Sequence, residues 1–148
     1  MSLGNNILIV CIGNICRSPA AEGFVADYFE KNNLSRAVAS AGIHALVGEG
    51  AASHTTKIMK DVYGIDVSAH RARQLTTSMM RDHDLILAME SGHVEFLKKN
   101  YPFAAGKTFV IGRWREIEID DPYRQSEDIF EKRIALIREC TYDWLNKL

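Results

Sequence analysis

Short apolar runs alternate with segments of helical periodicity along most of this chain, and the alternation limits the folds open to it. Four runs are aliphatic, end close to a turn signal and have the length typical of buried strands. They are NNILIVC (5–11), RAVASAG (36–42), DLILAM (84–89) and KTFVIG (107–112). Strands separated by helices predict an α/β fold: a single-domain, three-layer sandwich with a four-stranded parallel sheet and helices on both faces.

The segments between and after these strands repeat their apolar residues at helical spacing. In the segment that follows the first predicted strand, we expect Ser18 to cap a helix and Pro19 to occupy its first position. Residues 43–52 are expected to form a glycine-rich loop. The further predicted helices are 55–63, ended by Gly64; 91–100, capped by Ser91; and 126–148, with Cys140 on its buried stripe.

Charge and composition exclude several classes of protein. Lys and Arg number 18 against 19 Asp and Glu, so no charge excess points to nucleic acid or to a membrane surface. No apolar run approaches the ~20 residues that cross a bilayer, and no signal-peptide pattern opens the chain. Three cysteines without such a signal favour a reducing, cytoplasmic setting and thiol chemistry. We expect one domain over 1–148, and we interpret the leading MSLG (1–4) as an expression scar.

The stretch CIGNICRS (11–18) lies where the first strand ends and the first helix begins. Ligands of parallel sheets bind at the carboxyl ends of strands, and a helix N-terminus favours an anion. The stretch lacks the lysine of nucleotide-binding loops, but it places Arg17 six residues after Cys11. The residues between them can curl so that backbone N–H groups surround a phosphate, while Arg17 supplies a bidentate fork. These groups favour the thiolate form of Cys11, which predicts a nucleophile.

The other residues of this loop are expected to bind the phosphate or to support the loop. Gly13 and Asn14 tolerate unusual backbone angles, and the Ser18 hydroxyl can donate a hydrogen bond to the sulfur. The expected set is Ile12, Gly13, Asn14, Ile15, Cys16 and Ser18.

Each cysteine of the loop also has a simpler interpretation. A lone cysteine is usually a small buried hydrophobe, so Cys11 alone would not identify an enzyme. Cys16 is either plain packing or a nearby thiol that protects Cys11 from irreversible oxidation by forming a disulfide with it. The position of the loop between a strand and a helix favours the anion site.

The stretch VCIGNICRSP (10–19) resembles the C-x-G-N-x-C-R-S-P signature of the low-molecular-weight protein tyrosine phosphatases at every specified position. The similarity continues, in order, through SAG (40–42), AHRARQL (69–75), LAME (87–90) and DPY (121–123). The loop IHALVGEGA (43–51) is most similar to bacterial members that act opposite tyrosine autokinases of capsule and exopolysaccharide export.

This resemblance implies roles for individual residues. Cys11 would be the nucleophile and Arg17 the clamp on the phosphate and transition state. Ser18 would support the thiolate, and Asn14 would hold the loop. Further implied residues are Ser40 and His70 as partners of that asparagine, and Cys16 as the cysteine that in some members forms a reversible disulfide with the nucleophile.

A departing phenolate needs a proton, and IEIDDPY (117–123) offers two acids. Adjacent residues of an extended segment point in opposite directions, so Asp120 and Asp121 should not both face the pocket. Pro122 fixes the conformation of Asp121 most firmly, and the resemblance also favours Asp121. A turn-forming Asp-Pro pair is the structural alternative.

The walls of the substrate cleft are expected to include Tyr123 and Leu46. Tyr123 would sandwich the substrate ring, unless it only packs on the surface. Leu46 stands where many family members carry an aromatic residue, which bears on substrate preference.

These residues predict a phosphotyrosine phosphatase that works through a cysteinyl-phosphate, with phosphate or another oxyanion in the loop. The resemblance implies that its protein substrate is a tyrosine autokinase. No cofactor or metal is expected, since His44, His54, His83 and His93 lack ligand spacing and are interpreted as solvated or capping residues. The alternatives are an arsenate reductase, which needs a relay of further cysteines, and a module that only binds phosphotyrosine.

Overall fold

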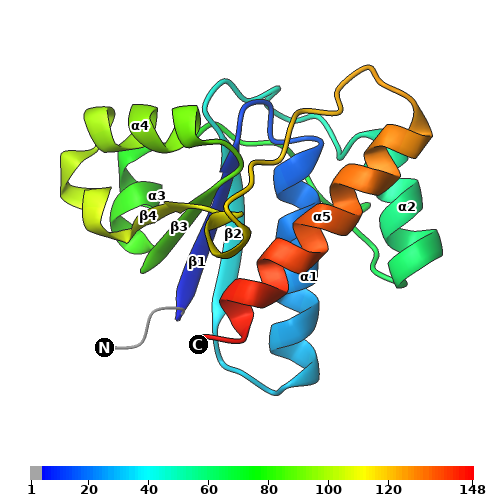
Figure 1. Cartoon of the computed structure of the whole chain (residues 1–148), viewed down its shortest axis with the longest axis horizontal. Helices are drawn as coiled ribbons and strands as arrows, with labels where there is room; N and C mark the ends of the chain where they lie inside the picture. The colour runs from blue at the N-terminus through cyan, green and yellow to red at the C-terminus, as the bar shows by residue number, and fades with distance from the viewer. Residues whose placement is uncertain (1–4) are drawn as a thin grey trace.

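The computed structural model describes residues 5–148, so the predicted expression scar lies outside the described residues. The predicted α/β architecture is confirmed: four parallel strands form one sheet in the order β2-β1-β3-β4 (Figure 1). The strands are β1 (Asn6–Cys11), β2 (Ala37–Gly42), β3 (Leu85–Ala88) and β4 (Thr108–Val110). β1 is an inner strand, so its carboxyl end lies in the middle of one sheet edge.

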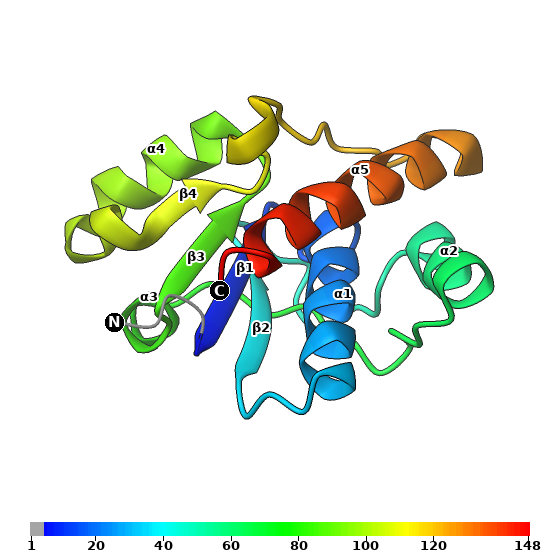
Figure 2. The same cartoon turned by 60° about the horizontal axis from the view of Figure 1, so that its bottom comes forward.

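Alternate residues of the inner strands point into two different cores, because side chains alternate across a sheet. Ile7 and Ile9 pack with α1 (Arg17–Lys31), α2 (Ser53–Tyr63) and α5 (Glu127–Leu145). On the other face, Leu8 and Val10 pack with α3 (Thr77–Asp82) and α4 (Ser91–Asn100). Figure 2 shows these two helical layers with the sheet between them. Two short 3₁₀ helices, η1 (Pro102–Lys107) and η2 (Arg113–Arg115), flank β4.

Two predicted helix caps are wrong. α1 begins at Arg17 behind Cys16, so Ser18 lies inside the helix and Pro19 is its third residue rather than its first. The hydroxyl of Ser18 instead contacts the side chains of Cys11 and Asn14. α4 likewise has Glu90 at its N-cap, so Ser91 is its first helical residue.

Other boundaries agree with the predictions or differ by a few residues. Gly64 ends α2 with a left-handed φ of 68°, as its lack of a side chain permits. α2 begins two residues before the predicted start, at Ser53. Cys140 is fully buried in α5, which ends at Leu145. α3 was not predicted, since six residues are too few to show a clear period.

None of the helices formed by residues 5–148 combines the length and the apolar character needed to span a bilayer.

Candidate active site

The loop from Cys11 to Cys16 joins the carboxyl end of β1 to the N-terminus of α1. Both cysteines are buried and free, and no side chain caps the first turn of α1. The uncapped amides and the helix dipole therefore remain available to an anion at this point.

Every backbone carbonyl of this loop accepts a hydrogen bond from outside it. The six donors lie in the loop after β2, in α2 and in the loop before α3. They are Ile43 N to Cys11 O (2.9 Å), His44 N to Ile12 O (3.0 Å), Leu46 N to Gly13 O (3.0 Å), His70 Nε2 to Asn14 O (2.6 Å), Ala52 N to Ile15 O (2.8 Å) and Thr55 Oγ1 to Cys16 O (3.1 Å). Because the N–H that follows a carbonyl points the opposite way in a trans peptide, outward carbonyls turn the loop amides inward. The segment 43–55, predicted only as a loop and a helix start, thus shapes the site.

Asn14 is the centre of a buried network. It has a left-handed φ of 60°, a conformation that asparagine tolerates better than most residues. Its Nδ2 donates to Ser18 Oγ (2.8 Å) and to Ser40 Oγ (2.9 Å), and its Oδ1 accepts from the amide of Arg73 (3.0 Å). Ser40 and His70 therefore both contact Asn14, as the resemblance implied.

Gly13 differs from its expected conformation. Its φ is not left-handed, and an added Cβ would meet only ordinary contacts with Ile15 and Leu46, the nearest at 3.8 Å. Of the two residues predicted to need unusual angles, only Asn14 adopts them.

The Ser18 hydroxyl lies next to the Cys11 sulfur. Its Oγ lies 2.9 Å from Cys11 Sγ. Since that Oγ already accepts a hydrogen from Asn14 Nδ2, the hydroxyl proton is free to be donated to the sulfur. A hydrogen bond to a thiolate stabilises its charged form.

Arg17 is held by two anchors that the sequence did not reveal. Its Nη1 donates to Glu90 Oε2 (2.6 Å) and to the carbonyl of Ile119 (2.7 Å), and the side chain is only 2% exposed. Both anchors bind the same nitrogen, so the Nε–Nη2 edge of the guanidinium is the edge that can bind two phosphate oxygens. Glu90 directly follows the predicted strand 84–89 next to β1, which is the signal that could have found it.

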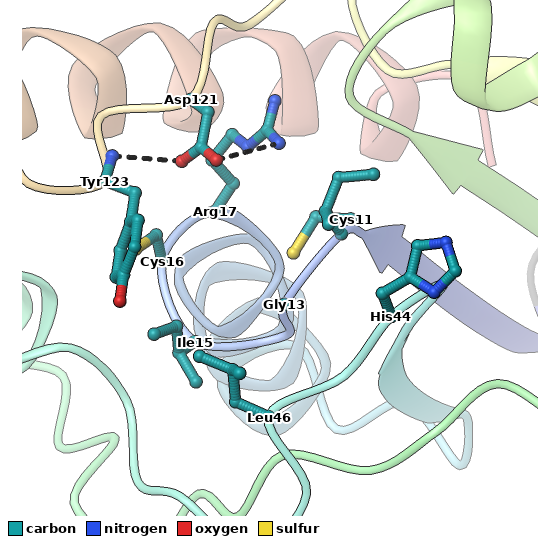
Figure 3. Close-up of a pocket in the computed structure, with 10 residues that line it drawn as sticks. Cys11, Gly13, Ile15, Cys16, Arg17, His44, Leu46, Asp121 and Tyr123 are labelled. Atoms are coloured by element: carbon teal, nitrogen blue, oxygen red, sulfur yellow. Dashed lines mark hydrogen bonds and ion pairs between the residues drawn. The ribbon is translucent and has the colours of Figure 1, made fainter.

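A pocket of about 200 Å³ opens above the loop (Figure 3). Asp121 and Tyr123 lie on one side of the Cys11 sulfur, and His44 lies on the other. The lining residues are Cys11, Ile12, Gly13, Ile15, Cys16, Arg17, His44, Leu46, Asp121 and Tyr123. Among the histidines interpreted as solvated or capping, His44 is exposed but belongs to this pocket, and His93 is partly buried beside Glu90.

The two acids of the DDPY stretch separate as predicted for neighbours in an extended segment. Asp121 lines the pocket, with Oδ2 at 3.8 Å from Arg17 Nη2. Asp120 turns outward, is 76% exposed and lies 3.7 Å from Arg133 of α5. Asp121 is therefore the acid that can reach a bound phosphate ester.

The thiols of Cys16 and Cys140 both have raised pKa values. Burial, followed by the charges of Asp121 and Cys11, raises the pKa of Cys16 to about 12. Burial raises the pKa of Cys140 to about 11, and its place in the α5 core keeps it away from the pocket lining. Cys140, the one described cysteine outside the loop, therefore does not lie in the pocket where an arsenate reductase would need a further thiol.

Comparison with known proteins gives a consistent result. The family model of Low molecular weight phosphotyrosine protein phosphatase matches residues 6–148. The probable low molecular weight protein-tyrosine-phosphatase AmsI of Erwinia amylovora is 41% identical over 145 residues, 97% of each chain. The low molecular weight protein-tyrosine-phosphatase Wzb of Escherichia coli K12 is 39% identical, over 97% of this chain and 95% of that one.

Solved structures share the fold and contain anions. Vibrio vulnificus Wzb in complex with benzylphosphonate superposes with a TM-score of 0.91 at 41% identity, covering 98% of this chain and 99% of that one. Wzb from Escherichia coli K30 in complex with sulphate gives a TM-score of 0.90 at 33% identity, covering 97% and 98%. Sequence and structure agree over nearly the whole length: the chain belongs to the low molecular weight phosphotyrosine protein phosphatase family.

Proposed function

We propose that this phosphatase hydrolyses phosphotyrosine through a cysteinyl-phosphate, with Cys11 as nucleophile, Arg17 as phosphate clamp and Asp121 as acid and base. The single observation that carries the proposal is the outward hydrogen bonding of all six loop carbonyls. It leaves a ring of amides beneath a pocket that also holds a thiol, a guanidinium and a carboxyl group.

The first step transfers the phosphoryl group to sulfur. The phosphate dianion binds the loop amides and the Nε–Nη2 edge of Arg17, which offset its charge as the transition state forms. Cys11 Sγ attacks phosphorus in line, forming a P–S bond while the bond between phosphorus and the tyrosine oxygen breaks. Protonated Asp121 gives its proton to that oxygen, so the leaving group departs as a neutral phenol.

The second step releases phosphate. The Asp121 carboxylate takes a proton from water, whose oxygen attacks phosphorus while the P–S bond breaks. Inorganic phosphate leaves, and Cys11 returns as a thiolate that the Ser18 hydroxyl stabilises at 2.9 Å. Asn14 supports this bond by donating to Ser18 rather than accepting from it.

The walls of the pocket fit an aromatic ring. Tyr123, Leu46, Ile12 and Ile15 surround the entrance, and the first two are each more than two-fifths exposed. A planar ring placed against Tyr123 gains apolar contact on both faces, whereas a phosphoserine is too short to reach it. This favours phosphotyrosine over phosphoserine.

The relatives and the loop resemblance also support a proposal about the pathway. We infer that residues 1–148 act as one cytoplasmic phosphatase domain on a bacterial tyrosine autokinase of capsule or exopolysaccharide export. The similarity to AmsI and Wzb proteins and the three free cysteines, which suit a reducing compartment, support this inference.

Turnover of para-nitrophenyl phosphate tests the reaction. The unsubstituted protein should release phosphate, and Cys11→Ser should bind phosphate but abolish release. A phosphopeptide panel then tests the substrate class, with phosphotyrosine peptides expected to be hydrolysed and phosphoserine peptides not. Binding of phosphotyrosine without any release would identify a binding module and overturn the proposal.

A further inference from the structure

His93 lies beside an anchor of Arg17, although none of the steps above uses it. It is in the first turn of α4, and its Nε2 is 3.5 Å from Glu90 Oε2. That oxygen also accepts the 2.6 Å hydrogen bond from Arg17 Nη1. Glu90 Oε2 therefore lies between Arg17, the proposed phosphate clamp, and the partly buried imidazole of His93.

The surroundings of His93 assign its tautomer. Its side chain is 12% exposed, and among residues 5–148 its buried Nδ1 has no hydrogen-bond partner. A proton on Nδ1 would be a buried donor without an acceptor, which is costly, so the proton belongs on Nε2, facing Glu90. Burial and then the charge of Arg17 lower the pKa of His93 from 6.5, against the opposing effect of Glu90, Asp121 and Glu118. The ring is therefore neutral at neutral pH.

Glu90 is the N-cap residue of α4, but its side chain does not cap the helix. Its side chain makes no hydrogen bond to the first turn of α4, although that position favours such a bond. Arg17 Nη1 donates to Glu90 Oε2 instead, and His93 Nε2 lies 3.5 Å from the same oxygen.

We propose that His93 is a positioning residue for Arg17: its Nε2–H fixes the Glu90 carboxylate, and Glu90 in turn aims the guanidinium at the phosphate. This inference rests on the proposed role of Arg17. Without the imidazole donor, the Glu90 side chain gains rotamer freedom and can turn away from Arg17. Arg17 then keeps only the Ile119 carbonyl as an anchor, and its Nε–Nη2 edge loses its fixed direction.

Sulphate binding measured by calorimetry tests this inference, because sulphate keeps its charge near neutral pH and occupies a relative of known structure. His93→Leu should weaken sulphate binding about three- to tenfold, as loss of a hydrogen bond to a charged group would. His93→Gln, which restores an N–H donor, should bind within about twofold of the unsubstituted protein. His83→Leu, at the end of α3 and outside the pocket lining, is the matched control and should bind normally.

A double-mutant cycle separates positioning from general stability. In an Arg17→Lys background, which removes the guanidinium, the effect of His93→Leu on sulphate should shrink to less than about twofold. An effect of unchanged size, or a His93→Gln variant as weak as His93→Leu, would overturn the inference. Should His93→Leu fail to fold, ¹⁵N NMR of the unsubstituted protein decides: a proton on Nε2 supports the inference, and a proton on Nδ1 overturns it.

The two proposals fail differently. Normal turnover of para-nitrophenyl phosphate with no effect of His93→Leu on sulphate overturns the role of His93 alone. An unsubstituted protein that neither binds sulphate nor releases phosphate overturns the proposed function, and the role of His93 with it.

Discussion

Asp121 Oδ1 accepts a hydrogen bond from the backbone amide of Tyr123 at 3.0 Å. The residue proposed as the acid is thus fixed by the residue proposed as the wall for the substrate ring. This bond closes a small turn around Pro122 and leaves Oδ2 directed at the pocket, 3.8 Å from Arg17 Nη2.

The acid can be tested without disturbing that turn. Asp121→Asn keeps an acceptor for the Tyr123 amide but cannot protonate the leaving group, so kcat on phosphotyrosine should fall about 10²- to 10⁴-fold. The loss should be smaller on para-nitrophenyl phosphate, whose leaving group needs no proton. Asp120→Asn is the matched control and should stay within about twofold of full activity, because Asp120 faces solvent near Arg133. Equal losses in both variants would contradict the assignment.

Gly42 allows the loop 11–16 to lie close to the loop after β2. A Cβ at this position would be 2.4 Å from the Ile12 carbonyl oxygen and 3.0 Å from Ala45 Cα, both backbone atoms. Gly42→Ala should therefore lower the free energy of unfolding by about 1–3 kcal/mol and reduce kcat/KM, since Ile12 must move. Denaturant titration and turnover of para-nitrophenyl phosphate measure these effects.

Gly92 provides the control for that experiment. It lies in α4, and a Cβ there would meet nothing within 4 Å. Gly92→Ala should raise stability by up to about 1 kcal/mol and leave activity unchanged. A Gly42→Ala variant as stable and active as Gly92→Ala would show that the close approach is not needed.

The cysteines should differ in reactivity toward iodoacetamide at neutral pH. A pKa of about 12 for Cys16 and about 11 for Cys140 keeps both protonated, and both are buried. Mass spectrometry should find Cys11 alkylated first, at a rate that sulphate slows and that Cys16→Ser leaves unchanged. Faster labelling of Cys16 would contradict the proposed roles of the two thiols.

Stability should depend on pH through His93. Its pKa in the folded protein is lowered from 6.5, mainly by burial. As the pH falls through 6.5, His93 takes up a proton in the unfolded chain but stays neutral in the folded protein. The free energy of unfolding therefore decreases from this pH down to the pKa of His93 in the folded protein. In His93→Gln, the decrease of Tm between about pH 7.5 and about pH 5.5 should be smaller than in the unsubstituted protein. An identical decrease would argue against a buried, neutral imidazole.

The sequence was informative where function depends on one continuous segment. The position of the loop 11–18 between a strand and a helix could be predicted from local patterns, and so could the opposite directions of Asp120 and Asp121. The contacts of Glu90 and of the Ile119 carbonyl with Arg17 were not predicted, because they are tertiary contacts across 73 and 102 positions. The one available signal was the place of Glu90 directly after a predicted strand. The capping role predicted for Ser18 is wrong, whereas the predicted contact of its hydroxyl with the sulfur is present. A serine before a helix predicts a cap, but here Cys11 Sγ and Asn14 Nδ2 both contact the hydroxyl.

The loop after β2 illustrates the other difficulty. Its glycines indicated a loop, but they did not indicate that the backbone amides at 43, 44 and 46 would donate hydrogen bonds to carbonyls of the loop 11–16. Such contacts use main-chain atoms, which every residue has, so composition and spacing contain no information about them.

The inner position of β1 has a consequence for motion. Residues 7–10 pair with β2 and β3 at once, and Cys11 is the next residue along. Amides in such a strand exchange with deuterium only when the whole sheet opens. The slowest-exchanging amides of the molecule are therefore expected at residues 7–10, directly before Cys11. The position of the Cys11 sulfur would then stay fixed for as long as the sheet remains closed.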